Sequence, residues 1–146
     1  MGIEENKEVV RKYIEEVLNN GDYTNVDDYL HEDFAGRPMA RDLKDKDDHK
    51  KSFTEARKQV PDMHNTIQEL VAEGDTVVAI TTWSLTDTIG FFGNPPTNKQ
   101  HETKTIVVYS FKDGKIIKGI ALSDRLGVCK QLGITPDMDT VPMPSN

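Results

Sequence analysis

Four extended runs in the second half of the chain constrain its fold more than any other feature. They cover approximately residues 63–73, 76–88, 101–112 and 115–123. The last three runs are rich in Val, Ile, Thr and aromatic residues, which favour strands. Gly74-Asp75 and Asp113-Gly114 are tight-turn signals between neighbouring runs, whereas the junction at residues 89–98 is longer. The sequence therefore predicts strands that pair antiparallel as hairpins.

Helical patterns fill the first part of the chain. Apolar residues from Val9 to Leu18 recur at helical spacing opposite a charged face, and Asn19-Asn20-Gly21 supplies a C-terminal stop. Thr24-Asn25 can cap a short second helix that ends before Glu32. We therefore expect two helices before Glu32.

A third helix is expected from near Asp45 to just before Pro61, because proline disfavours helical geometry in the residue that precedes it. The segment from Phe34 to Lys44 is expected to be a loop. Helices followed by a meander of strands predict an α+β fold, with the helices packed on one side of an antiparallel sheet. A twisted sheet of long strands can curl around its helices and leave a pocket between the two layers.

Length and charge limit the classes of function. The 146 residues fit one domain, which we place at residues 1–133, followed by an extended Pro-containing tail at residues 134–146. The chain carries 18 basic and 25 acidic residues, a formal net charge of -7, and no segment concentrates Lys and Arg with aromatic residues. We therefore expect no nucleic-acid partner.

Cysteine usage and hydropathy point to a compartment. Cys129 lies in an apolar run and is expected to be a buried small hydrophobe, and a single thiol cannot form an internal disulfide. No stretch approaches the roughly 20 apolar residues of a membrane span, and the N-terminal segment is a charged amphipathic helix and not a signal peptide. We expect a cytoplasmic protein without a membrane partner. The histidines show no converging ligand set, so we also expect no metal and no cofactor.

A carboxylate at the end of the last extended run is the main candidate for chemistry. In a regular strand Ile116, Ile120, Leu122 and Asp124 share one face, with Lys118 as the only polar interruption. A carboxylate that faces an apolar enclosure loses hydration of its charged form, which raises its pKa and makes it a usable acid or base near neutral pH. Asp124 could instead cap a helix, because Asp is a preferred N-cap residue and an apolar run follows it. The residues alone leave both interpretations open.

A series of short motifs then identifies a family by its order and spacing. The motifs lie at residues 6–21, 60–62, 72–78, 93–97, 113–116, 124–127 and 131–133. Together they resemble the SnoaL-like polyketide cyclases, also known as predicted ester cyclases, of the nuclear transport factor 2-like superfamily. The resemblance covers most of the chain. It implies a cone-shaped, cystatin-like fold in which a curved antiparallel sheet wraps around N-terminal helices and encloses a pocket.

The resemblance also bears on the role of the carboxylate. In cyclases of this family an aspartate at the end of the last strand acts as general acid and base in an intramolecular aldol ring closure, and Asp124 occupies the matching position. The family resemblance therefore favours a pocket-facing Asp124 over a helix cap.

Two departures from the family pattern affect the expected chemistry. Family members commonly carry histidine where this chain has Arg37, and many carry histidine where it has Asp87. Neutral imidazole can donate or accept near pH 7, whereas Arg37 can only donate and ionised Asp87 can only accept. With Asp124, these residues resemble in type the Asp/Arg/Asp set of limonene-epoxide-hydrolase-like members of the superfamily. Arg37 could equally be a solvated loop cation, and Asp87 an exposed residue near a strand end.

The catalytic candidates are therefore Asp124, Arg37 and Asp87. Apolar and aromatic residues on the predicted inner faces and on the long junction are the candidates for a substrate pocket, although such aromatic residues more often belong to the core. These candidates are Tyr13, Phe53, Trp83, Phe91, Ile120 and Leu122. Phe91 and Phe92 together could form a pocket lid or a subunit contact.

Several functions fit this pattern. The first is a cofactor-independent enzyme that performs aldol-type cyclisation or isomerisation on an apolar, carbonyl-bearing substrate. The alternatives are a non-catalytic protein that binds an apolar small molecule, an epoxide-hydrolase-like hydrolase with an Asp/Arg/Asp set, and a dimerisation scaffold. The mixture of polar and apolar residues from Thr103 to Phe111 suggests that a second subunit covers the outer face of the sheet, so we expect a homodimer.

Overall fold

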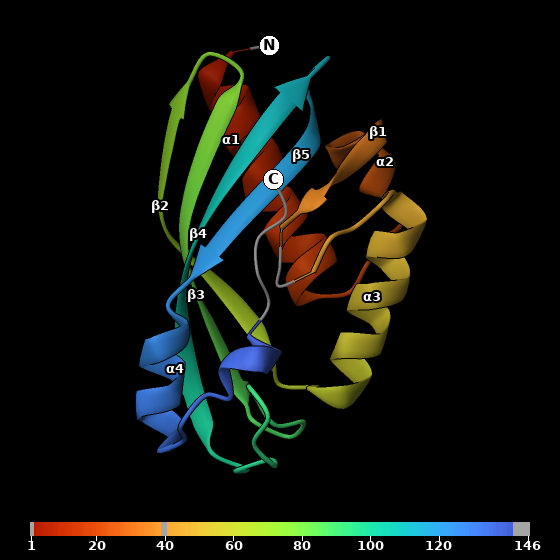
Figure 1. Ribbon diagram of the computed structural model, residues 1–146. Coiled ribbons are helices and arrows are strands. Elements are labelled where there is room, and N and C mark those ends of the chain that lie inside the picture. Colours follow the sequence, from red (N-terminus) through yellow and green to blue (C-terminus); the bar gives the residue numbers. More distant parts are fainter. Residues whose placement is uncertain (1, 39–40, 142–146) are drawn as a thin grey trace.

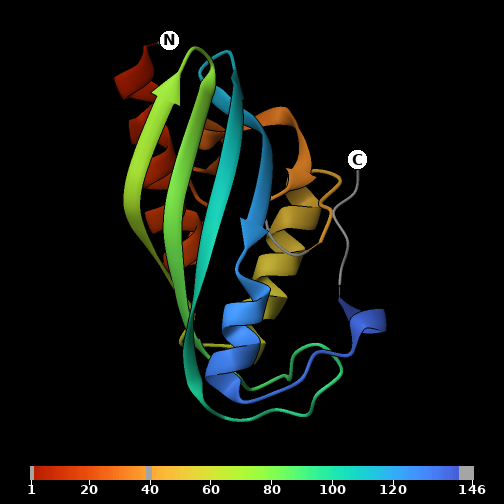
Figure 2. The same cartoon turned by 60° about the vertical axis from the view of Figure 1, so that its left-hand side comes forward.

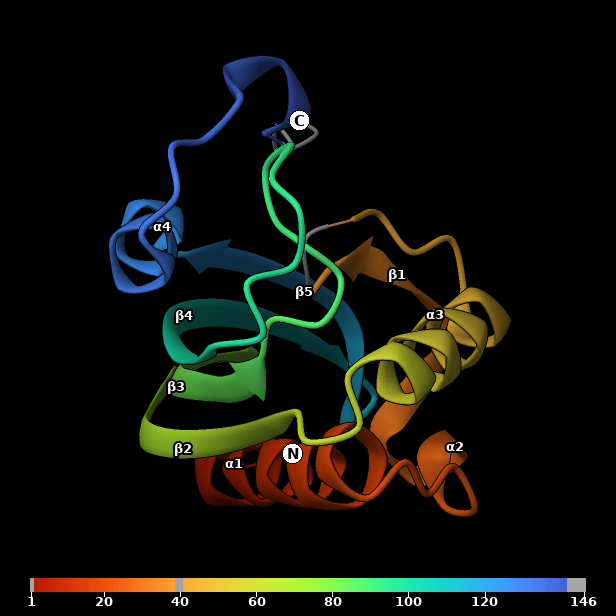
Figure 3. The same ribbon diagram turned by 90° about the horizontal axis from the view of Figure 1, so that it is seen from below.

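The computed structural model describes residues 2–38 and 41–141. In these residues a curved, unclosed sheet of five strands lies against helices from the first half of the chain, with α1 and α3 on its concave side (Figures 1 and 3). The strand order is β1-β5-β4-β3-β2. The elements are α1 (Ile3–Lys12), the π-helical segment η1 (Tyr13–Asn19), α2 (Val26–Tyr29), β1 (Leu30–Arg37), α3 (Lys46–Gln59), β2 (His64–Glu73), β3 (Thr76–Thr86), β4 (Gln100–Lys112), β5 (Lys115–Ser123), α4 (Arg125–Leu132) and the 3-10 helix η2 (Met138–Thr140). The predicted α+β fold is confirmed.

The predicted boundaries of the third helix are confirmed, whereas Asn25 precedes α2 without a side-chain cap hydrogen bond. The Asp45 side chain accepts a hydrogen bond from the Asp48 backbone N–H at 2.8 Å and starts α3, which ends at Gln59 ahead of Pro61. Helix α1 continues directly into η1, and together they bury the apolar stripe around Val10 and Val17.

The predicted hairpins are also confirmed. Strands β2 and β3 pair antiparallel across Gly74, and β4 pairs antiparallel with β3 on one side and with β5 on the other. Gly74 and Gly114 both adopt a positive φ, +56° and +75°, which the tight turns require. The hairpin signals in the sequence therefore set most of the sheet.

The loop predicted for residues 34–44 is wrong over its first part, because β1 runs from Leu30 to Arg37 and pairs in parallel with β5. A Cβ on Gly36 would lie 2.6 Å from the Gly119 carbonyl oxygen, so the two backbones approach more closely than any larger residue allows. Parallel pairing with a strand far along the chain has no local sequence signal, which explains the error.

A bulge in β5 changes which side chains face the helices. Phe111 of β4 pairs with Ile116, but the preceding residue, Ser110, pairs with Lys118. Ile117 is therefore an extra residue, and the side-chain alternation of β5 reverses at this point.

The face predicted for β5 is consequently wrong. Ile116 is fully buried against the helices, whereas Ile120 and Leu122 lie on the outer face and are 43% and 66% exposed. Ala121 and Ser123 take the inner positions beyond the bulge, opposite Val107 and Thr105 of β4. A one-residue shift moves every following side chain to the other face of the sheet.

Buried apolar side chains occupy the half of the inner sheet face nearest the β2–β3 turn, which we call the core half. Its sheet residues are Val77, Ala79, Val107, Tyr109, Phe111 and Ile116. They pack against α1 and η1, and no polar sheet residue interrupts them. The other half, nearest α4, carries Thr81, Trp83, Thr103, Thr105 and Ser123, and we call it the cavity half.

Candidate functional site

A cavity of about 290 Å³ lies over the cavity half of the inner sheet face. Thr103 and Ser123 contribute from β4 and β5, and Arg125 and Val128 contribute from α4. The remaining walls come from Gly90, Phe91 and Phe92 of the β3–β4 loop (residues 87–99) and from Thr140 of η2. Segments that are distant in the sequence thus form one enclosure beside the curved sheet.

Hydroxyl groups form a row at the border between the core half and the cavity. The Oγ atoms of Thr105 and Ser123 lie 2.9 Å apart, and the Thr81 hydroxyl donates to the Thr105 carbonyl oxygen at 3.4 Å. Thr81 also accepts from the Asn65 amide at 3.2 Å. The cavity therefore has apolar walls and a few converging hydroxyls, the usual composition of a small-molecule site.

The C-terminal segment and the β3–β4 loop lie side by side (Figures 2 and 3). Both contribute residues to the cavity wall. The Asp137 N–H donates to the Phe92 carbonyl oxygen at 2.8 Å, and the Asn94 side chain donates to the Thr135 carbonyl oxygen at 2.8 Å. Residues 134–141 of the predicted tail are therefore part of the enclosure. Residues 142–146 of that tail lie outside the described residues.

A second, apolar chamber of about 210 Å³ adjoins the cavity. The two spaces share Phe92 and Arg125, and the second is also lined by Cys129, Pro136 and Met138. An elongated ligand could therefore place a polar end near the hydroxyls and an apolar end in the second chamber. The prediction that Cys129 is a buried hydrophobe is confirmed.

Asp124 has an exposed side chain and caps α4. Its Oδ1 accepts from the Gly127 N–H at 2.8 Å, and its own N–H donates to the Lys104 carbonyl oxygen at 2.9 Å. Its side chain does not share a buried face with Ile116, and it is not among the residues that line the cavity. The helix-cap interpretation is therefore the one that describes its contacts, because the bulge and the start of α4 both turn it away from the apolar enclosure.

Asp87 is fully buried and anchors the β3–β4 loop. Its carboxylate accepts from the Gly90 N–H at 2.8 Å and from the N–H and hydroxyl of Thr97, both at 2.9 Å. Burial by itself would raise the pKa of Asp87, but the hydrogen bonds from Thr97 and Gly90 lower it below its ordinary value. These bonds make Asp87 an ionised structural anchor, and the exposed position considered from the sequence is wrong.

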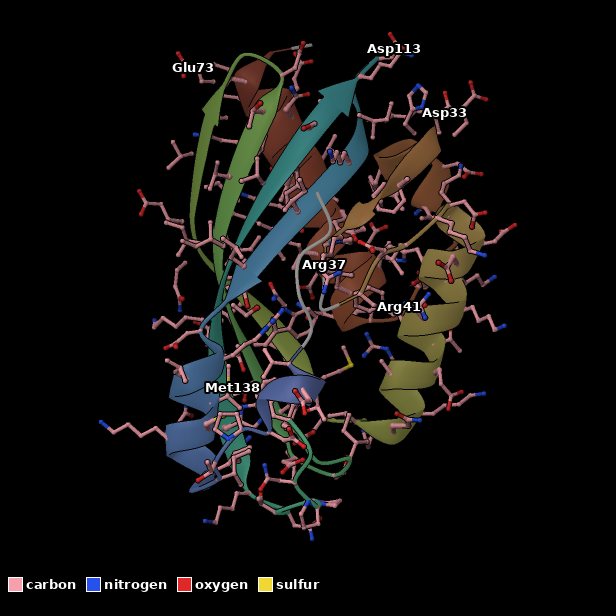
Figure 4. All side chains as sticks on the ribbon, viewed as in Figure 1. Asp33, Arg37, Arg41, Glu73, Asp113 and Met138 are labelled. Carbon is pink, nitrogen blue, oxygen red and sulfur yellow. The ribbon has the colours of Figure 1, made fainter. Side chains whose placement is uncertain are left out.

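Arg37 is buried at the end of β1, near the middle of the molecule (Figure 4). Its guanidinium lies 3.4 Å from the Asp42 carboxylate, so it is not a solvated cation. The three catalytic candidates therefore have separate partners. Arg37 contacts Asp42, Asp87 accepts hydrogen bonds from the β3–β4 loop, and Asp124 accepts a hydrogen bond from the N-terminus of α4.

Phe91 is the predicted pocket residue that lines the cavity. Trp83, on β3, lies next to the cavity wall, because it pairs with the wall residue Thr103 of β4. Ile120 and Leu122 face outwards and cannot line the cavity, because the bulge places them on the opposite face.

Tyr13 and Phe53, the other two predicted pocket residues, surround a buried histidine. The Tyr13 hydroxyl lies 2.7 Å from His49 Nε2, the Tyr23 hydroxyl lies 2.9 Å from Nδ1, and the Phe53 ring stacks on the imidazole at 4.6 Å. The Tyr23 hydroxyl donates to the His49 carbonyl oxygen at 3.4 Å, so it accepts from Nδ1–H, and the Tyr13 hydroxyl then donates to Nε2. Burial lowers the pKa of His49 to about 4, which keeps the imidazole neutral.

One group of side chains in the described residues could gather metal ligands: His31, Glu32 and Asp33. The same hollow is lined by Lys46 and Lys115, whose charges oppose a cation. His31 Nε2 also faces Asp113 at 3.7 Å. The arrangement is thus a network of opposite charges.

Sequence reasoning missed most of the cavity wall. Ser123 and Arg125 flank the residue that the family resemblance singled out, but the bulge that turns Ser123 inwards has no signature in the sequence. Thr140 lies in a segment predicted to be an extended tail. No sequence pattern marked His101 as a site residue, yet its side chain is 3% exposed and lies next to the wall residue Thr103.

Comparisons with known proteins agree with this geometry. The family model of the SnoaL-like polyketide cyclases matches residues 7–132. A candidate polyketide cyclase from Acidithiobacillus ferrooxidans shares 29% identity, with a TM-score of 0.72 over 91% of this chain and 98% of its own. IdmH from Streptomyces antibioticus shares 24% identity, with a TM-score of 0.74 over 88% and 99% of the two chains.

TsrD from Streptomyces laurentii superposes with a TM-score of 0.78 at 22% identity, over 92% of this chain and 99% of its own. At that identity the likeness concerns the fold alone. No curated protein matches the sequence. In the described ranges 2–38 and 41–141, no helix has the length and apolar character needed to cross a bilayer.

Proposed function

Because the chain belongs to the SnoaL-like polyketide cyclase family, with its nuclear transport factor 2-like fold, we propose that it is a small-molecule enzyme that acts at the cavity described above. The proposed reaction is cofactor-independent acid-base catalysis, an aldol-type cyclisation or isomerisation of an apolar, carbonyl-bearing substrate. The observation that carries this proposal is the cavity itself, whose aromatic and aliphatic walls border three hydroxyl-bearing residues and one guanidinium.

The wall residues supply the polar contacts that a carbonyl substrate needs. Thr103 and Ser123 can each donate a hydrogen bond to a ligand oxygen, and Arg125 carries a permanent positive charge at the same wall. Donors that are already oriented towards a ligand oxygen stabilise the negative charge of an enolate without the reorganisation that water requires. We propose that these three residues bind the carbonyl group and that Phe91 and Phe92 cover the apolar part.

One observation favours a second candidate, a non-catalytic binding protein. Among the described residues, the cavity wall contains no carboxylate and no imidazole, so none of them brings a proton-transfer group into direct contact with the cavity. Arg37, Asp87 and Asp124 each have other partners, which also removes support for the epoxide-hydrolase-like alternative. The two remaining candidates differ in whether a bound ketone exchanges its acidic protons.

Proton exchange on a compact apolar ketone tests the proposal. We expect the protein to accelerate deuterium exchange at the carbons next to the carbonyl of 2-tetralone in D₂O, followed by proton NMR. Replacing both hydroxyls, with Ser123→Ala and Thr103→Val, should slow exchange on the order of 10²-fold, the usual effect of losing an oxyanion donor. Binding of 2-tetralone without any accelerated exchange would instead support the binding protein.

We also propose a homodimer formed through an outer patch on the convex sheet face, which lies in front of the helices in Figure 2. Its members are Val71, Ile106, Val108, Ile120 and Leu122, all at least 40% exposed. Ile106 pairs with Leu122 and Val108 with Ile120, so the patch is continuous across β4 and β5. Exposed apolar surface of this kind marks an association site.

Sedimentation at micromolar concentration tests the dimer. Ile106→Lys should yield a monomer because it places a charge inside the patch, while Thr66→Lys, at an exposed position on β2, should leave the dimer intact. A wild-type protein that remains monomeric would contradict the proposal. From composition we further propose the cytoplasm as its compartment.

A further inference from the structure

A buried histidine lies directly behind the cavity wall. His101 is near the start of β4, pairs across the strands with Leu85, and is 3% exposed. Two wall residues contact its ring: the Phe91 ring meets it edge-on at 5.3 Å, and the Thr103 hydroxyl lies 3.4 Å from Nδ1. The imidazole is therefore one side chain away from the enclosed space.

The second ring nitrogen of His101 is unusual in having no polar contact. Nε2 is buried and has no hydrogen-bond partner in the described residues. Leaving a buried polar atom unpaired costs about 1–3 kcal/mol, and each such atom calls for an explanation. An imidazole nitrogen used by a ligand supplies one, because the ligand would then be the missing partner.

The electrostatic surroundings keep the imidazole of His101 neutral. Burial lowers the pKa of His101, while the negative charges of Asp87 and Asp62 oppose that effect, and the net result is a pKa below the ordinary value of 6.5. At pH 7 the ring is therefore uncharged and offers a free lone pair. Both carboxylates would stabilise the imidazolium that forms when this lone pair takes a proton.

The Phe91 ring, which meets the His101 ring edge-on, belongs to the β3–β4 loop. Phe91 precedes Phe92, which has a positive φ of +52°, and glycines with positive φ lie on either side at Gly90 and Gly93. A positive φ is costly for a bulky residue such as phenylalanine and nearly free for glycine. Asp87 anchors the start of the loop, and the Phe91 carbonyl oxygen accepts from the Asn94 N–H at 3.0 Å, so the backbone can stay in place while the Phe91 side chain rotates.

We propose that His101 is the proton acceptor of this cavity and acts through Nε2 on a ligand that displaces the Phe91 ring. The inference rests on the proposed function, since the ligand enters the same enclosure. The proton leaves a carbon next to the ligand carbonyl and binds Nε2, and the electron pair of the broken C–H bond stays on the ligand as an enolate. The imidazolium then returns the proton to the product, so the cycle is balanced without a co-reactant.

An activated probe tests the base separately from the carbonyl-binding residues. In 5-nitrobenzisoxazole a base removes the C3 proton and the ring N–O bond breaks in the same step, giving a coloured phenolate without any enolate. We expect turnover by the wild-type protein and a loss on the order of 10²-fold in His101→Gln, the contribution of a positioned base. The matched control is His64→Gln, an exposed histidine on β2, which should retain full turnover.

Two further readouts separate a chemical role from a structural one. The wild-type rate should fall as the pH drops through the pKa of His101, and Phe91→Ala, which hydrates the ring, should move this fall to higher pH. Long-range proton–nitrogen NMR should show the same shift in the titration of His101. Circular dichroism checks that His101→Gln is folded. If this variant does not fold, the pH–rate profile of Phe91→Ala still tests the role of His101.

The outcomes distinguish the inference from the proposed function. Fluorescence of Trp83, the single tryptophan, reports probe binding next to Thr103. A probe that binds and reacts equally in wild type and folded His101→Gln would overturn the role of His101 and leave the enzyme proposal standing. A probe that neither binds nor reacts with the wild type would overturn both.

Discussion

The two halves of the inner sheet face are built from the same strands and have opposite properties. In the core half, Val77 and Tyr109 are buried against α1 and η1. In the cavity half, Thr103 and Ser123 face an open cavity of about 290 Å³. The core half stabilises the fold by burying apolar side chains, whereas the cavity half buries fewer of them and leaves space for a ligand. Mutations in the two halves should therefore affect stability and function separately.

The largest expected effect is on the core half. Tyr109 is 2% exposed and meets the Tyr13 ring edge-on at 5.9 Å. Tyr109→Ala should lower the free energy of unfolding by about 3–5 kcal/mol, the usual cost of truncating a buried aromatic residue. Thr103→Ala, in the cavity half, should cost less than about 1 kcal/mol because Thr103 is only half-buried and its hydroxyl makes one long contact, 3.4 Å, with His101. Urea unfolding measures both, and equal losses would show that the two halves are not energetically distinct.

A buried histidine near the core half should make stability depend on pH. The folded pKa of His49 is about 4, below the ordinary value of 6.5, so the unfolded chain binds the extra proton first as pH falls. The stabilisation is therefore complete above pH 6.5 and is lost as the pH drops towards 4, by up to about 3 kcal/mol. Thermal unfolding between pH 7 and 4.5 measures this slope.

The control for that slope is a variant without the imidazole. His49→Phe removes the titrating group and should flatten the pH dependence, whatever its effect on stability at pH 7. A wild-type protein whose unfolding free energy does not change between pH 7 and 4.5 would contradict the neutral, buried state of His49.

An amide in α1 offers a smaller effect in the opposite direction. Asn6 is fully buried, and neither its Oδ1 nor its Nδ2 has a partner in the described residues. Asn6→Leu keeps the branching pattern and removes the unpaired polar atoms, so it should raise the free energy of unfolding by roughly 1–3 kcal/mol. A loss of stability, measured by urea unfolding, would show that the amide is hydrogen-bonded in solution. The matched control is Asn19→Leu, whose amide pairs with the Asn65 backbone and whose loss should destabilise.

The contrast between the halves also explains what could be predicted from sequence. Turns and caps are local, so Gly74, Asp45 and Pro61 indicate hairpins and helix ends that the structure confirms. Strand β1 and the bulge at Ile117 depend on pairing partners far along the chain, and no local pattern encodes them. The fold follows mostly from the first kind of signal.

The site depends on the second kind of signal. Ser123 faces inwards only because of the bulge, and Thr140 reaches the cavity only because Asp137 pairs with Phe92. The family resemblance indicated the correct end of β5, but it pointed to Asp124, which lies between the wall residues Ser123 and Arg125. Family motifs therefore locate the region, and tertiary contacts decide which side chain of that region faces the ligand.

Asp124 provides the smallest expected effect on stability and separates its two interpretations. Asn is as good an N-cap as Asp, so Asp124→Asn should change the unfolding free energy by only a few tenths of a kcal/mol, whereas Asp124→Ala should lose about 1 kcal/mol. As a helix cap, Asp124→Asn should also leave deuterium exchange on 2-tetralone unchanged. As the acid-base group implied by the family resemblance, it should slow exchange by about 10²–10⁴-fold with the fold intact. Measuring both variants therefore decides whether the carboxylate leaves its bond to the Gly127 N–H during turnover, because only a carboxylate that enters the cavity makes the charge of residue 124 matter.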